Sequence, residues 1–113
     1  MTSNPKALLK IDFGSGLKLG PGKIRLLELV AKTGSISAAA RQMEMSYRRA
    51  WLLIDELNDM FGALVVEKST GGSGGGGAKV TSFGQQVVAA FNEIENATNQ
   101  LVAEKIAPLL NQG

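Results

Sequence analysis

The segment Gly34–Phe61 constrains the fold of this chain most, because it has the pattern of two helices joined by a tight turn. The first helix contains Ala38–Ala40, whose small side chains let a second helix cross close by. We expect Ser37 to cap the first helix and Ser46 the second, since a serine hydroxyl can accept a free N–H group of an opening turn. Apolar residues then recur at steps of three and four, which predicts one buried face for the second helix. These residues are Ala50, Leu53, Ile54, Leu57 and Phe61.

The second of these helices begins with cationic and aromatic groups. A small first helix, a turn and a cationic helix start are typical of a helix-turn-helix, whose second helix enters the major groove of DNA. Arginine suits guanine there because its guanidinium donates two hydrogen bonds, to O6 and N7. We therefore predict that DNA is read by Ser46, Tyr47, Arg48 and Arg49. The alternative is an ordinary helical hairpin whose arginines only face solvent.

The composition fits one domain and argues against an enzyme. The chain contains neither cysteine nor histidine, so it lacks thiolate ligands, disulfides and the commonest general base. We expect no catalytic residues and no metal site. Up to Thr81 there are eleven Lys or Arg and seven Asp or Glu, a net charge of +4, whereas the rest of the chain carries −2. The part that holds the helix-turn-helix is thus the basic part, which favours contact with nucleic acid.

Regular structure is also predicted before the helix-turn-helix. The apolar runs Ala7–Phe13 and Leu17–Leu19 flank a Gly-Ser-Gly sequence, which predicts a short hairpin. A helix is expected from Lys23 to Lys32, ended by Gly34. Its predicted inward residues are Ile24, Leu27, Val30 and Ala31.

A second hairpin is predicted directly after the helix-turn-helix. The strands Leu64–Ser69 and Ala78–Val80 enclose the glycine-rich loop Thr70–Gly77, which is the arrangement of a wing. Glycines let a backbone approach phosphates closely and offer its N–H groups. The alternatives are a flexible linker and a nucleotide-binding loop, but Lys79 precedes valine rather than the Ser or Thr that a P-loop needs. We expect the DNA backbone to be held by Ser35, Ser37, Lys68, Thr70, Gly72, Ser73, Gly74 and Lys79.

The last predicted element is a helix from Ser82 to about Ile106, capped by Thr81 and ended by Pro108. Apolar residues seven apart, with alanines between them, give a stripe typical of helix pairing. At about 1.5 Å per residue the helix is ~37 Å long, more than a small domain can cover. We therefore predict a homodimer through Val87, Phe91, Ile94 and Leu101. The alternative is a helix that packs only within its own fold.

Two sets of residues resemble known regulators. Gly34–Glu67 is similar to the N-terminal winged helix of LysR-type regulators, with the sequence Gly-Ser-Ile-Ser-x-Ala-Ala followed by Met-Ser and Leu-x-x-x-Phe-Gly. The chain also resembles the DNA-binding domain of ModE-type molybdate-responsive regulators, in Ser-Tyr-Arg-x-Ala-Trp at 46–51, the glycine wing and Val-Thr-x-x-Gly at 80–84. This resemblance implies a dimeric transcriptional regulator, typically a repressor of molybdate-uptake genes. Because the molybdate-binding domains of that family are missing from this sequence, we expect no cofactor in this chain and molybdate only through a separate domain or chain.

Together these patterns predict an α+β fold, mainly α, in the form of a winged helix-turn-helix with an N-terminal hairpin, a glycine-rich wing and a long dimerisation helix. Residues 1–81 would be the DNA-binding domain and residues 82–113 the dimerisation helix and tail, within one compact unit. The expected partner is double-stranded DNA with a palindromic operator. With no apolar run for a signal or membrane span, we expect a cytoplasmic protein. The rival function is a winged-helix module that binds protein, or an oxyanion through its glycine wing.

Overall fold

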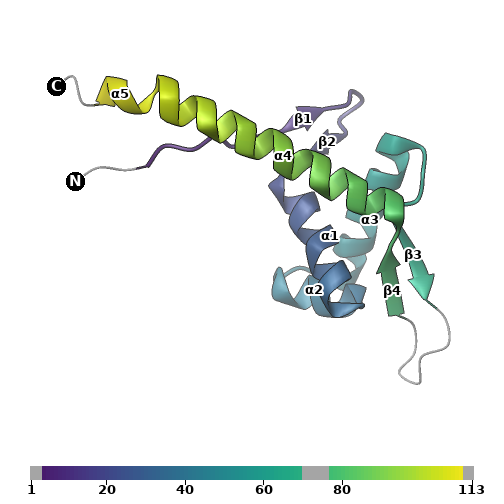
Figure 1. Ribbon diagram of the computed structural model, residues 1–113. Coiled ribbons are helices and arrows are strands. Elements are labelled where there is room, and N and C mark those ends of the chain that lie inside the picture. The colour runs from purple at the N-terminus through teal and green to yellow at the C-terminus, as the bar shows by residue number, and fades with distance from the viewer. Residues whose placement is uncertain (1–3, 70–76, 111–113) are drawn as a thin grey trace.

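The computed structural model describes residues 4–69 and 77–110, which form five helices and two small hairpins (Figure 1). The elements in chain order are β1 (Ile11–Asp12), β2 (Lys18–Leu19), α1 (Pro21–Thr33), α2 (Ile36–Gln42), α3 (Tyr47–Phe61), β3 (Val66–Ser69), β4 (Gly77–Val80), α4 (Ser82–Lys105) and α5 (Ala107–Leu110). β1 pairs antiparallel with β2, and β3 pairs antiparallel with β4. The predicted winged helix-turn-helix fold, with its N-terminal hairpin and long C-terminal helix, is confirmed.

Two helices end at glycines whose backbone is left-handed. Gly34 follows α1 with φ 69° and donates its N–H to the carbonyl oxygen of Val30 at 2.8 Å. Gly62 follows α3 with φ 62°. A residue without Cβ adopts this conformation at little cost, so both helix ends are encoded locally. The start of α1 is also local, because Pro21 has the φ angle of a first helical residue.

Serine and threonine side chains cap the starts of α2, α3 and α4, with one correction to the sequence prediction. The Ser46 hydroxyl accepts the N–H of Arg49 at 3.0 Å, and the Thr81 hydroxyl accepts that of Gly84 at 2.9 Å, as predicted. The prediction for Ser37 was wrong, because Ser35 caps α2 by accepting the N–H of Ala38 at 3.0 Å. The buried side chain of Ile36 belongs to the first turn, so α2 begins one residue before Ser37.

The core lies where α1, α2 and α3 meet the wing and the first half of α4. Leu27, Val30, Ile54 and Leu57 are completely buried, and so are the small residues at the crossing of α2 and α3. Those small residues are Ala39 and Ala50. The turn between the two helices contains Glu44 with φ 54°, a conformation that is uncommon for a residue with a side chain. The prediction that Ala31 faces inward was wrong, since its side chain is exposed and α1 buries Leu26 and Leu29 as well.

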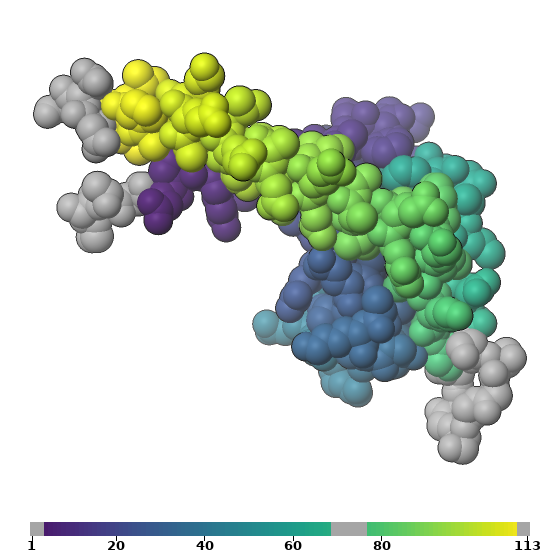
Figure 2. All heavy atoms as spheres, in the orientation of Figure 1, coloured from purple at the N-terminus to yellow at the C-terminus, as the bar shows by residue number. Residues whose placement is uncertain are grey.

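Helix α4 gives the molecule its elongated shape. Its first half packs across α1 and the wing, whereas its second half extends beyond the three-helix body (Figures 1 and 2). The radius of gyration is 16.9 Å, against about 13 Å for a compact chain of this length. The N-terminal segment runs beside the projecting half, where the Ala7 N–H donates to Asn99 Oδ1 at 2.7 Å. α4 ends before Pro108, as predicted, but the four-residue α5 follows it.

None of the helices within residues 4–69 and 77–110 combines the length and the apolar character that crossing a bilayer needs.

Candidate nucleic-acid interface

The first turn of α3 presents its side chains to solvent. Ser46, Tyr47, Arg48 and Arg49 are all exposed, and Tyr47 has an exposed fraction of 53%. The next residue, Ala50, is completely buried, which fixes the rotation of the helix about its axis. The four residues predicted to read DNA therefore do lie together on an accessible helix start. A helix N-terminus also carries a partial positive charge, which adds to the charge of the two arginines.

On one side of this helix start, aromatic residues connect α3 to the wing. The rings of Tyr47 and Trp51 meet edge to face with their centroids 6.4 Å apart. Lys68 of β3 places its Nζ 5.1 Å from the centre of the Trp51 ring, a cation–π geometry. Trp51 is half-buried, so it joins the recognition helix to the base of the wing. Lys68 is thereby held beside the exposed turn of α3.

The base of the wing is also hydrogen-bonded to the turn before α2. The N–H of Ala78 in β4 donates to the carbonyl oxygen of Gly34 at 2.9 Å. In the wing register Lys79 stands opposite Glu67, and both side chains are exposed. The start of α2, the wing and α3 are thus fixed relative to one another. A single duplex could touch all three.

On the opposite side of α3, the N-terminal hairpin contributes a basic cleft. Its lining includes Arg49 together with Lys10, Lys18 and Lys23. Lys23 is held within the fold, since its Nζ donates to the Lys18 carbonyl oxygen at 2.8 Å and pairs with Glu56 at 3.2 Å. Neither Lys10 nor Lys18 forms an ion pair with any other residue in the described ranges. Arg49 also lines a second hollow, on the outer face of α3, together with Arg48, Leu52 and Asp55. Arg49 thus stands between the two hollows.

The structure places only some of the predicted backbone contacts. Ser35 and exposed Ser37 lie at the start of α2, and Lys68 and Lys79 lie on the wing strands. The Ser35 hydroxyl oxygen already accepts the Ala38 N–H as the cap. The remaining predicted contacts fall outside the described residues; these are Thr70, Gly72, Ser73 and Gly74.

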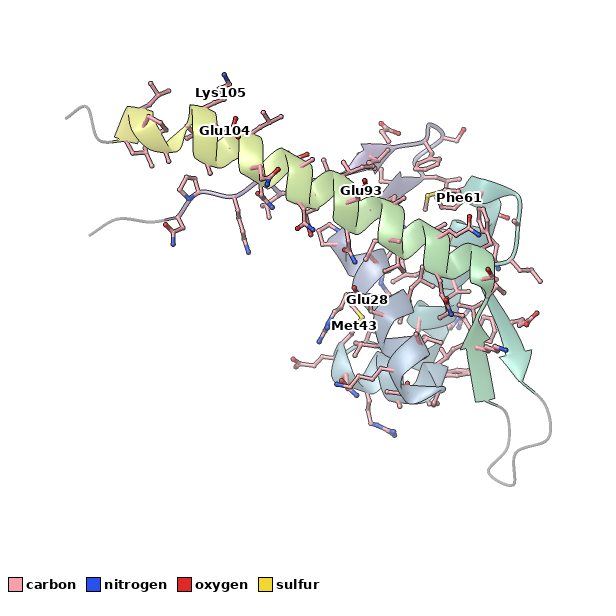
Figure 3. All side chains as sticks on the ribbon, in the orientation of Figure 1. Glu28, Met43, Phe61, Glu93, Glu104 and Lys105 are labelled. Atoms are coloured by element: carbon pink, nitrogen blue, oxygen red, sulfur yellow. The ribbon has the colours of Figure 1, made fainter. Side chains whose placement is uncertain are left out.

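The residues predicted for dimerisation divide into two groups. Val87 and Phe91 are 6% and 2% exposed and belong to the core of this chain. Ile94 and Leu101 are 43% and 55% exposed on the second half of α4. The difference arises because α4 crosses the three-helix body only with its first half. In Figure 3 the neighbouring Glu104 lies on the projecting half, well away from α1 and α2.

Several residues of this surface were missed by the sequence reasoning. Lys10 and Lys18 could not be assigned, because no local pattern shows that the first hairpin packs beside α3. Leu52 could have been found. It falls outside the buried positions of α3, and it lines the hollow that also contains Arg48 and Asp55.

The arrangement suits binding more than chemistry. The side chains around α3 offer hydrogen-bond donors and positive charge, which match the phosphates and guanine edges of DNA. In the described part of the chain, acidic residues do not gather into a group that could hold a metal ion.

Comparison with known proteins agrees with this geometry. Residues 22–85 match the family described as bacterial regulatory helix-turn-helix protein, lysR family. The chain is 40% identical over 80% of its length to the molybdenum-pterin-binding protein MopA of Rhodobacter capsulatus, covering 34% of that protein. It is 39% identical over 75% of its length to the DNA-binding transcriptional dual regulator ModE of Escherichia coli K12, covering 32% of it. The chain is also 33% identical over 94% of its length to the molybdenum transport protein ModE of Azotobacter vinelandii, covering 39% of that protein.

The chain therefore spans about a third of the length of these curated relatives. Among solved structures, ArgP from Mycobacterium tuberculosis superposes with a TM-score of 0.51 at 20% identity, over 77% of this chain and 29% of that one. At this identity the likeness shows the fold alone.

Proposed function

Because the chain belongs to the lysR family of bacterial regulatory helix-turn-helix proteins, we propose that it binds double-stranded DNA as a transcriptional regulator of the ModE type. The names of its relatives, which mention molybdenum binding and transport, make molybdenum-related genes the proposed targets. The observation that carries the proposal is the first turn of α3. Arg48 and Arg49 are exposed there, while the next residue, Ala50, is buried and anchors the helix in the core.

In the proposed complex α3 enters the major groove with its N-terminal end. Arg48 lies on the outer face and Arg49 on the side of the first hairpin, so each can reach a different base or phosphate. The Ser46 hydroxyl accepts the Arg49 N–H and holds this turn in its helical conformation. Tyr47, which packs on Trp51, is the contact on the side of the wing.

Phosphates are held on both sides of the groove in this proposal. Lys68 and Lys79 on the wing contact one strand, and Lys10 and Lys18 on the first hairpin contact the other. Such contacts fix register and orientation without reading sequence. The hydrogen bond between β4 and Gly34 supports this role, because it links the base of the wing to the turn that precedes α2.

The proposed assembly is a two-fold dimer through the projecting half of α4. Ile94 and Leu101, seven residues apart, form an exposed stripe on α4. Ala97 lies between them in this stripe, and Ala90 precedes Ile94. Ile94 also borders an apolar groove that includes exposed Phe13, so the stripe continues into a larger apolar surface. Two recognition helices related by such symmetry would lie about 34 Å apart, which predicts a palindromic operator.

Selection of duplexes from a random pool with the purified chain tests this proposal, followed by titration of a selected duplex at several salt concentrations. We expect an enriched palindrome and an affinity that falls about 10³–10⁵-fold between 50 and 200 mM salt, the range for six to ten phosphate contacts. Arg48→Ala should lower the affinity by at least tenfold, since a good arginine–guanine pair contributes about 1–3 kcal/mol.

Lys105→Ala is the matched control, because it removes the same charge from the projecting end of α4, far from α3 (Figure 3). It should bind like the unmodified chain. A pool that yields no enriched sequence, or equal losses for Arg48→Ala and Lys105→Ala, would contradict the proposal.

A further inference from the structure

Leu52 is an aliphatic residue on the outer face of the recognition helix. Its side chain is 50% exposed, one helical turn after Arg48, and both residues line the same hollow. The next residues of α3, Leu53 and Ile54, are buried in the core. Leu52 therefore adds little to the core, and its position is set by the outer face of α3.

The surface of the major groove limits what an aliphatic side chain can bind there. Hydrogen-bond donors and acceptors occupy the edges of all four base pairs, and the C5-methyl group of thymine is the apolar feature among them. A leucine in the groove desolvates polar edges without replacing their hydrogen bonds, unless it meets this methyl group. An exposed leucine at this place thus favours thymine.

The order of charged residues along the outer face of α3 limits how much of this helix can enter the major groove. Arg48 is followed by Leu52 and then by exposed Asp55 and Asp59. The two carboxylates would be repelled by phosphates, so the groove accepts the first two turns of α3 and excludes the later ones. Leu52 lies within the part that enters.

We propose that Leu52 contacts the C5-methyl group of a thymine and makes that base pair a specificity determinant of the operator. The inference rests on the proposed DNA-binding function. One turn of α-helix rises 5.4 Å and one base step about 3.4 Å, so this thymine lies within one or two base pairs of the base or phosphate contacted by Arg48.

A methyl scan of the selected duplex tests the inference. Each thymine is replaced in turn by deoxyuridine, which lacks only the methyl group, and affinity is measured for the unmodified chain and for Leu52→Ala. At one thymine of a half-site we expect the unmodified chain to lose affinity about fourfold, the effect of one buried methyl group. Leu52→Ala should bind that site more weakly and be indifferent to the replacement there, while it responds normally to replacements elsewhere.

Leu64→Ala is the matched control, because Leu64 is 57% exposed beyond the C-terminal end of α3. It should keep the full methyl response, and Leu52→Met, which retains an aliphatic contact, should keep most of it. If Leu52→Ala shows the same response as the unmodified chain at every thymine, the inference is overturned while DNA binding stands. If no duplex binds the unmodified chain, the proposed function and the inference both fail.

Discussion

Replacing Gly84 by alanine should destabilise the protein through one close backbone contact. Gly84 is buried in the first turn of α4, which faces the base of the wing. A Cβ atom there would stand 2.3 Å from the carbonyl oxygen of Val65 and 2.8 Å from Cγ1 of Val80. The first distance is about 1 Å shorter than an ordinary carbon–oxygen contact. Either α4 or the strand that follows Val65 must therefore move.

The expected loss of stability is the sum of two unfavourable contributions and one favourable contribution. Overpacking of this kind costs about 1–3 kcal/mol. The Val65 carbonyl oxygen also accepts the Thr81 N–H at 2.9 Å, and weakening this bond costs about 1 kcal/mol. Alanine favours a helix over glycine by at most about 1 kcal/mol, which offsets part of the loss. The net expectation is a decrease of about 2 kcal/mol in the free energy of unfolding.

Urea denaturation measures this change, with Gly22→Ala as the matched control. Gly22 lies exposed near the start of α1, and a Cβ atom there would have no neighbour within 4 Å. Gly84→Ala should lower the urea midpoint by roughly 1 M, whereas Gly22→Ala should leave it unchanged or raise it slightly. A Gly84→Ala variant as stable as the unmodified chain would refute the packing of α4 on the wing described above.

Three further predictions concern the cap of α3, the wing and the dimer. Ser46→Ala should cost about 1 kcal/mol in urea denaturation by removing the cap of α3, whereas Ser37→Ala, which removes no cap, should change the stability by less than half of that; equal effects would contradict the finding that Ser46 caps a helix and Ser37 does not. Trp51 is the only tryptophan, so its fluorescence should change when a duplex binds, and Lys68→Ala should reduce the salt slope of binding by about one phosphate contact; an unchanged slope would remove Lys68 from the interface. Leu101→Glu should convert the dimer to monomer in sedimentation and weaken operator binding; a variant that stays dimeric would exclude pairing through this part of α4.

Local signals in the sequence were sufficient for most of the fold. Gly34, Ser46 and Thr81 mark helix ends through their own backbone or hydroxyl chemistry, and each has the predicted role. The buried face of α3 followed from its periodicity in the same way. The cap of α2 was misplaced because two serines stand two residues apart, and only the burial of Ile36 decides between them.

Long-range packing accounts for what the sequence could not provide. The first hairpin lies beside α3, so Lys10 and Lys18 join the basic surface although neither is near the helix-turn-helix in the chain. The heptad pattern of α4 predicted one continuous apolar stripe through Val87, Ile94 and Leu101, but the body of the domain covers Val87 and leaves only the later positions exposed. Periodicity identifies an apolar face without indicating which neighbour covers it.

Methylation interference on a selected duplex is the most direct test of how α3 meets DNA. Methylation of guanine N7 blocks the major groove, whereas methylation of adenine N3 blocks the minor groove. We predict that N7 methylation at one or more guanines of each half-site prevents binding. For Arg48→Ala or Arg49→Ala, methylation of one of these guanines should no longer change the affinity. Interference confined to adenine N3, or the same N7 pattern for both variants as for the unmodified chain, would contradict the placement of α3 in the major groove.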